Sequence, residues 1–130
     1  MKKHIEEYVA IWNSKGVSEL DRLFEDKSNY WDPNQHGPAI EVLRGALSST
    51  HEAFPDVMLE VVSLDEVNDH QFFLEWRMTG TNSGEFFGNP PTGKRIELVG
   101  LDSIKMEAGK ITEIRSYYDI NMIAQQMSPA

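Results

Sequence analysis

The chain has 130 residues, of which 40% are hydrophobic, and this length and content suit one domain with one core. A formal net charge of -9, with the basic residues scattered, argues against a phosphate-binding surface, so we expect no nucleic-acid partner. The absence of cysteine excludes a disulfide framework, a thiolate nucleophile and a cysteine-rich zinc site. The opening MKKHIEEYVAIW lacks an apolar run of the length that a signal sequence or membrane span needs, so we expect a cytoplasmic protein with no membrane partner.

The first half of the chain has the spacing of helices. Apolar side chains at i, i+3, i+4 and i+7 predict a first helix that ends near residues 13–16, and a second helix is expected over VSELDRLF (17–24). The short aromatic stretch from Tyr30 to Asp32, closed by a proline, reads as the end of a strand. A third helix is expected over residues 38–54.

The second half has the texture of strands. Strands are expected at 57–64, 71–81, 95–106 and 111–118, with a loop rich in glycine and proline at 82–94 and a short last helix at 119–127. The order of elements predicts a single α+β domain over residues 1–130, with three N-terminal helices packed across one curved antiparallel sheet.

One acidic residue lies in step with apolar ones. In RIELVGLDSIKM (95–106), side chains of a strand alternate between faces, and Asp102 shares its face with Ile96, Leu98, Ile104 and Met106. Asp102 therefore points inward. A buried carboxylate must be hydrogen-bonded, paired with a cation, or kept protonated by a raised pKa.

The sequence lacks the spacings of metal and nucleotide sites. The four histidines form no H-x-H or H-E-x-x-H pattern, and no glycine-rich turn opens a helix. We therefore expect no metal and no cofactor.

Several segments resemble a known family. The stretches FPD (54–56), GTNSGEFFGNPPTGK (80–94), GKITE (109–113) and DINMIAQQM (119–127) are similar to the signature of the SnoaL-like polyketide cyclases. These enzymes belong to the nuclear transport factor two-like superfamily, which includes ketosteroid isomerase. The resemblance implies a cone-shaped, cystatin-like α+β barrel with a deep pocket between the helices and the sheet.

The resemblance also implies an activity. Such cyclases close a ring by an intramolecular aldol reaction without a cofactor, and their acid/base aspartate matches Asp119. The alternative interpretation is that Asp119 only caps the last helix.

A comparison with ketosteroid isomerase singles out three further residues: Tyr8, Asp32 and Asp102. By that resemblance, a neutral Asp102 donates with Tyr8 to an enolate oxygen, while Asp32 removes a proton next to the carbonyl. The alternatives are that Tyr8 anchors a helix, Asp32 shapes a turn, and Asp102 pairs with Arg77 or Arg115.

Aromatic residues complete the expected pocket. Trp31, Trp76, Phe86 and Phe87 are candidates for binding an apolar substrate, although core packing explains the tryptophans equally well. Asn82, a further substrate-binding candidate, stands where these cyclases commonly have histidine.

The hypotheses for function thus share one cavity. The first is a cyclase or isomerase that moves a proton next to a carbonyl of an apolar small molecule. The alternatives are a non-catalytic binding module, a ketosteroid isomerase-like enzyme, and an epoxide hydrolase-like enzyme that uses Arg77. By analogy with the fold, we expect a homodimer formed through the outer face of the sheet.

Overall fold

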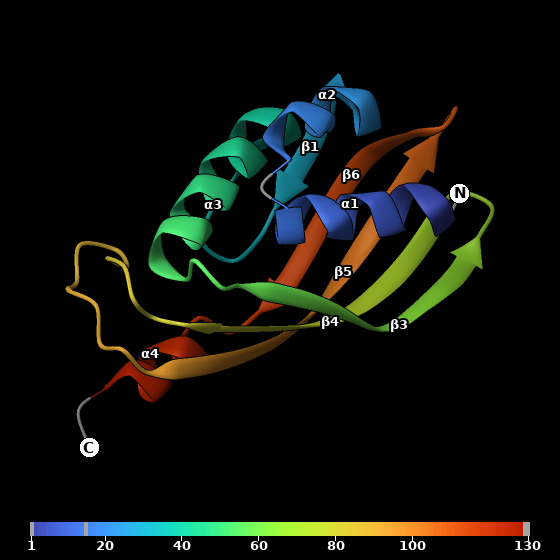
Figure 1. The fold of residues 1–130 in the computed structure, drawn as a ribbon. Coiled ribbons are helices and arrows are strands. Elements are labelled where there is room, and N and C mark those ends of the chain that lie inside the picture. Colours follow the sequence, from blue (N-terminus) through green and yellow to red (C-terminus); the bar gives the residue numbers. More distant parts are fainter. Residues whose placement is uncertain (1, 15, 129–130) are drawn as a thin grey trace.

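The structure is a computed structural model that describes residues 2–14 and 16–128. Helices and strands follow the expected order, helices first and a meander second (Figure 1). The elements in chain order are α1 (Lys2–Ser14), the 3-10 helix η1 (Val17–Glu19), α2 (Leu20–Leu23), β1 (Phe24–Trp31), β2 (His36–Pro38), α3 (Ala39–Ala53), β3 (Met58–Asn68), β4 (Gln71–Thr81), β5 (Arg95–Glu107), β6 (Lys110–Tyr118) and α4 (Asn121–Met127).

The strands form one six-stranded sheet in the order β2-β1-β6-β5-β4-β3. Four of the strand pairs are antiparallel, but β1 and β6 run parallel, so the sheet is mixed and not wholly antiparallel as expected. No hairpin joins β1 to β6, because they lie at opposite ends of the chain. Hairpin geometry therefore does not set their direction.

The boundary between α2 and β1 also differs from expectation. The helix expected over residues 17–24 is a 3-10 turn followed by a single α-helical turn, and β1 begins at Phe24, well before Tyr30. In β1 the side chains of Phe24, Ser28 and Tyr30 are buried, and the pairing with β6 shifts register between Phe24 and Asn29. Tertiary pairing thus makes a strand from a polar stretch that lacks a strand pattern.

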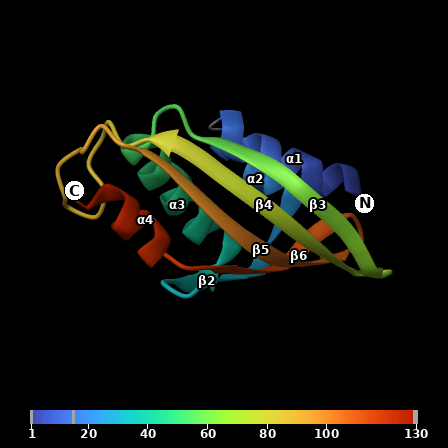
Figure 2. The same cartoon turned by 90° about the horizontal axis from the view of Figure 1, so that it is seen from below.

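The three N-terminal helices cover the concave face of the sheet, and α4 lies at one end of the sheet, beside β5 (Figures 1 and 2). Apolar side chains of α1 and α3, among them Ile5, Leu43 and Leu47, are buried against the sheet. None of the helices within residues 2–14 and 16–128 is long and apolar enough to cross a membrane.

The alternation predicted for residues 95–106 is confirmed. In β5 the inward residues Ile96, Leu98, Asp102 and Ile104 are buried, and Leu101 on the opposite face is 40% exposed. The strand therefore carries Asp102 into the interior between the sheet and the helices.

Candidate functional site

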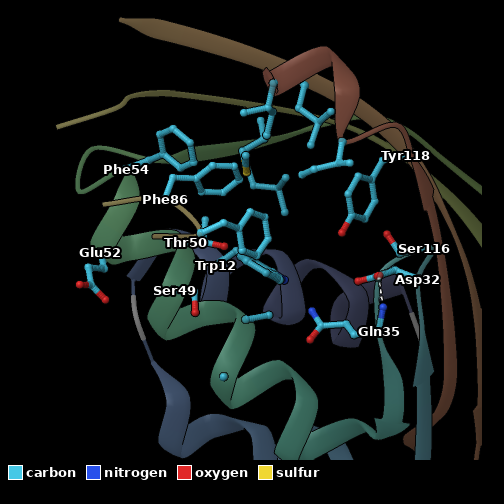
Figure 3. A pocket seen from close by; sticks show the side chains of 18 of the residues that line it. Trp12, Asp32, Gln35, Ser49, Thr50, Glu52, Phe54, Phe86, Ser116 and Tyr118 are labelled. Atoms are coloured by element: carbon cyan, nitrogen blue, oxygen red, sulfur yellow. Dashed lines mark hydrogen bonds between the residues drawn. The ribbon is translucent and has the colours of Figure 1, made fainter. Parts of the chain in front are cut away.

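A cavity of about 330 Å³ lies between α1, α3, the concave side of the sheet and α4. Figure 3 shows that its two ends differ in chemistry: Phe54 and Phe86 lie at one end, and Asp32, Ser116 and Tyr118 at the other. The volume is in the range of sites for small organic molecules. A ligand in this cavity therefore has an apolar end and a polar end.

The polar end is a row of side chains across three neighbouring strands. Ser116 of β6 pairs directly with Asp102 of β5, and on the other side Arg115 pairs with Trp31, the residue before Asp32. Neighbouring strands lie about 4.8 Å apart. The sheet register thus places Asp32, Ser116 and Asp102 side by side along one wall of the cavity.

Asp102 is 4% exposed and is held by two neutral donors. The indole Nε1 of Trp76 donates to its Oδ1 over 2.8 Å, and the Ser116 hydroxyl is also hydrogen-bonded to the carboxylate. Burial raises the pKa of Asp102 to about 6, since these two hydrogen bonds only partly offset the desolvation and the charge of Asp32 raises it further. A carboxyl group with this pKa exchanges protons readily near neutral pH.

Gly100 allows Trp76 to reach Asp102. The two residues are opposite each other in the β4–β5 pair, and a Cβ atom built on Gly100 would lie 2.3 Å from Cζ2 of the indole. The ring thus lies across the β5 backbone, where any other residue would collide with it. Because Gly100 has no side chain, the Trp76 ring packs directly against the β5 backbone, and this contact fixes the direction of the indole N–H.

Asp32 is 2% exposed and is also surrounded by donors. The Tyr30 hydroxyl donates to Oδ2 over 2.9 Å, and the backbone N–H groups of Asn34 and Gln35 donate to Oδ1 over 2.7 and 2.9 Å. The carboxylate therefore shapes the turn between β1 and β2, as the alternative interpretation held, while it also lines the cavity.

The Tyr118 hydroxyl lies beside the same carboxylate. Burial and the nearby charge of Asp32 raise the pKa of Tyr118 to about 12, although a hydrogen bond from Asn34 acts in the opposite direction. The hydroxyl keeps its proton at every physiological pH, so it serves as a neutral donor at the polar end.

Tyr8 of α1 is 2% exposed, lines the cavity and packs edge-on against Phe24, with ring centroids 5.9 Å apart. Burial, and next the charge of Asp102, hold the pKa of its hydroxyl far above the ordinary value. Its hydrogen-bond partner is the indole of Trp12, a group that only donates. The Tyr8 proton is therefore available to an oxygen of a ligand.

Three of the nine sequence-predicted site residues do not line the cavity: Asp119, Trp31 and Asn82. Asp119 is exposed, and its Oδ1 accepts a hydrogen bond from the backbone N–H of Asn121 over 2.9 Å, at the start of α4. Trp31 lies on the outer face of the sheet, where the Arg115 guanidinium stacks 4.3 Å from its ring centroid. The structure does not bring Asp119 or Trp31 to Asp102.

Asn82 is buried but holds a loop and does not line the cavity. Its Oδ1 accepts hydrogen bonds from the backbone N–H and the hydroxyl of Thr92, both over 2.9 Å, and its Nδ2 donates to the carbonyl of Gly84. It thereby closes the glycine- and proline-rich loop that carries Phe86 and Phe87 to the cavity.

Neither arginine offered as a partner of Asp102 pairs with it. Arg77 lies on the outer side of β4 and pairs with Glu60 over 3.2 Å, and Arg115 stacks on Trp31. An epoxide hydrolase-like site needs an arginine inside the cavity, and Arg77 is not among the lining residues.

The site also contains residues that were not predicted from the sequence, among them Trp12, Tyr30, Ser116 and Tyr118. Two of them had a usable signal, because Trp12 lies one helical turn after Tyr8 on the same face, and Tyr30 has the same strand parity as Asp32. Ser116 and Tyr118 follow only from the register of the β5–β6 hairpin.

Comparisons with known proteins agree with this architecture. The family model for SnoaL-like polyketide cyclase matches residues 2–127, and no curated protein matches the chain. Among solved structures, IdmH from Streptomyces antibioticus is 24% identical, with 97% of this chain and 96% of that chain covered and a TM-score of 0.83. AclR from Streptomyces galilaeus is 23% identical, with 97% and 79% covered and a TM-score of 0.85.

A third solved structure, from Catenulispora acidiphila, has a ketosteroid isomerase-like fold and was determined in complex with trimethylamine. It is 15% identical, with 95% of this chain and 91% of that chain covered and a TM-score of 0.80. At these identities the solved structures show the fold, while the match over residues 2–127 shows the family. The chain therefore belongs to the SnoaL-like polyketide cyclase family, with the fold of nuclear transport factor two and ketosteroid isomerase.

Proposed function

We propose that the protein is an acid/base enzyme that moves a proton at the carbon next to a carbonyl of an apolar small molecule. The observation that carries the proposal is the pair formed by Asp102 and Tyr8. One is a buried carboxyl group with a pKa of about 6, and the other a buried hydroxyl that lines the same cavity. Groups tuned in this way are typical of catalytic sites.

The proposed step begins with the Asp102 carboxylate as the base. It takes a proton from the carbon next to the carbonyl. The electron pair of the broken C–H bond forms a carbon–carbon double bond, and the π pair of the carbonyl moves to its oxygen. The Tyr8 hydroxyl donates a hydrogen bond to the resulting enolate oxygen. Asp102 then returns the proton to another carbon, or the enolate carbon attacks a second carbonyl in the same substrate, whose oxygen takes that proton. The charge of the enolate is delocalised within the substrate, so the step needs no cofactor.

The pKa of Asp102 decides between two roles for it. With a pKa of about 6, roughly nine-tenths of the carboxyl groups are ionised at pH 7, which suits a base better than the neutral donor expected from ketosteroid isomerase. Asp32 already accepts three hydrogen bonds, so we assign it a positioning role at the polar end. Asp119 receives no part in the proposed step.

Hydrogen exchange at carbon tests this step without knowledge of the natural substrate. A panel of apolar ketones and β-keto esters is incubated with the enzyme in D2O, and loss of the proton signal at the carbon next to the carbonyl is followed by NMR. We expect Asp102→Asn to slow the exchange by about 10²- to 10⁴-fold and Tyr8→Phe by about 10²-fold. Asp119→Asn is the matched control and keeps the wild-type rate. Exchange that is unchanged in Asp102→Asn contradicts the proposal.

We also propose that the protein forms a homodimer through the outer face of the sheet. On this face Phe73, Val99, Leu101 and Tyr117 are each about 40% exposed or more, on three adjacent strands. A row of exposed apolar side chains on a sheet is typical of an interaction surface. The cavity lies on the opposite, concave side of the sheet, so pairing through the outer face does not cover its lining residues.

A further inference from the structure

We propose that the cavity selects an apolar organic cation, so that the carbonyl substrate also carries a protonated or quaternary amine. This inference rests on the proposed function, because it names the substrate class of the same cavity. The observations that carry it are the unbalanced charge of the lining side chains and the chemistry of the cavity wall.

The two buried carboxylates of the polar end have no basic partner. Asp32 and Asp102 are hydrogen-bonded only to neutral donors, and none of the ion pairs within residues 2–14 and 16–128 includes either of them. Buried acidic groups are usually paired, because an unpaired buried charge destabilises the folded state. The counter-charge that the protein omits can be supplied by a ligand.

The rest of the lining adds negative charge and no positive charge. Glu52 of α3 and Glu85 of the loop also line the cavity, whereas no lysine, arginine or histidine is among the lining residues that the structure describes. Both glutamates are exposed, and in Figure 3 the Glu52 side chain points away from the interior of the cavity. An anionic ligand such as a carboxylate thus meets two buried acidic groups at the polar end, and the chain's net charge of -9 repels it from a distance as well.

The wall favours an organic cation over a metal ion. In the described part of the chain, no three acidic, histidine or cysteine side chains converge closely enough to hold a metal ion. Aromatic side chains, among them Trp12, Trp76 and Phe86, make up much of the lining. Aromatic faces attract ammonium groups that carry methyl or larger apolar substituents, since such groups lose little hydration on burial.

A cation at the polar end also assists the proposed chemistry. Formation of an enolate adds a negative charge to a site that already holds Asp32, and removal of the proton neutralises only Asp102. An ammonium group of the substrate near Asp32 offsets that charge in a poorly hydrated site, where charges interact strongly. The row of Asp32, Ser116 and Asp102 thus recognises the cation and the reacting carbon within one molecule.

Three probes of similar size and different charge test the inference by calorimetry at pH 7.5: benzyltrimethylammonium, phenylacetamide and phenylacetate. We expect benzyltrimethylammonium to bind at least tenfold more tightly than phenylacetamide, and phenylacetate at least tenfold more weakly. Asp102→Asn should reduce the preference for the cation at least tenfold. Glu41→Gln removes one negative charge from an exposed position of α3 outside the cavity lining, and this matched control should leave all three affinities unchanged.

The outcomes separate the inference from the proposed function. Equal affinity for the three probes, tighter binding of phenylacetate, or no binding of any probe overturns the inference, and so does a cation preference that is unchanged in Asp102→Asn. None of these results bears on the exchange assay. Conversely, a cation preference that Asp102→Asn removes supports the charge selection even where no exchange at carbon is found, and in that case only the proposed reaction fails.

Discussion

At the scale of single residues, Trp76 lowers the proton affinity of Asp102. Its indole N–H donates to Asp102 Oδ1 over 2.8 Å, and this bond lowers the pKa of the carboxyl group against the stronger effect of burial. The bond forms only because Gly100 leaves room for the ring. Gly100 and Trp76 therefore contribute, with burial, Ser116 and Asp32, to the pH range in which the proposed base acts.

Removal of this donor should raise the pKa of Asp102. In Trp76→Phe the carboxyl group keeps its burial but loses a hydrogen bond to its charged form, so we expect a pKa above about 6. Carbon-13 NMR titration of the aspartate carboxyl groups measures the shift. Trp31→Phe, on the outer face, is the matched control and should leave the titration of Asp102 unchanged. An Asp102 pKa that falls or stays the same in Trp76→Phe contradicts this assignment.

Asp102 should also make stability depend on pH. Its pKa is about 6 in the folded protein against 3.8 ordinarily, so the folded state binds more protons between these values, and stability falls as pH rises from about 4 to about 6. The loss is complete above that range and amounts to at most about 3 kcal/mol. Asp102→Asn removes the titration, so the variant should be more stable than wild type at pH 7.5 and similar to it near pH 4.

Urea unfolding at both pH values measures this difference. The pH dependence of the other titrating groups is common to both proteins and cancels when the variant is compared with wild type. A variant that is less stable than wild type at pH 7.5 would falsify the claim that the buried charge is a net cost to folding. It would not alter the expectation for exchange at carbon.

The sequence predicted well which side chains of a single strand point inward. It predicted poorly which side chains of other strands they bond to. The period of two placed Asp102 inside, and the same period explains why Trp31 and Asp32 point to opposite faces. The hydrogen bonds from Ser116 and Trp76 depend on which strand lies beside β5 and in which register, and alternation within one strand carries no such information. The exposure of Asp119 likewise depends on where α4 packs.

At the scale of elements, the Gln126 side chain joins α4 to β5. Its Oε1 accepts a hydrogen bond from the backbone N–H of Glu97 over 2.7 Å, and its Nε2 donates to the carbonyl of the same residue over 2.6 Å. The Gln126 side-chain amide thus makes the two backbone hydrogen bonds that a neighbouring strand would make with Glu97. This contact holds Ile123 of α4 in the cavity wall.

Gln126→Ala should loosen α4 without unfolding the sheet. The substitution removes the two hydrogen bonds to Glu97 and a third from Nε2 to the Met122 carbonyl. Loss of the two bonds between α4 and β5 corresponds to roughly 1.4 kcal/mol, or about tenfold faster amide exchange over residues 121–127. Hydrogen–deuterium exchange with mass spectrometry measures this, and Gln125→Ala, at an exposed position of the same helix, is the control. Uniformly faster exchange in the whole protein would show that Gln126 supports the fold and not α4 alone.

Among the elements, those with strong periodicity were predicted and the others were not. The first and third helices, the last short helix and the four long strands of the meander match the structure closely. The exceptions are the second helix, which is shorter than expected, and β1 and β2, which have few apolar residues of their own. β1 becomes a strand because β6 offers it an edge to pair with, and β1 in turn offers an edge to β2.

At the scale of the whole molecule, the outer face of the sheet determines the proposed assembly. Leu101→Lys places a charge among the exposed apolar side chains of β4, β5 and β6, so we expect it to convert a dimer into a monomer. Size-exclusion chromatography with light scattering gives the mass of each species. Ala10→Lys adds the same charge at an exposed position of α1 and should stay dimeric. A monomeric wild type would overturn the proposed homodimer.

The parallel pair of β1 and β6 also has a consequence for biosynthesis. Its register joins Tyr30 to Ile114, so β1, which Asp32 directly follows, finds its neighbour only after β6 has left the ribosome. A nascent chain that ends within β5 exposes the apolar faces of its helices and the unpaired edges of β1 and β5. Such chains are expected to need chaperone protection until the final hairpin emerges and closes the sheet.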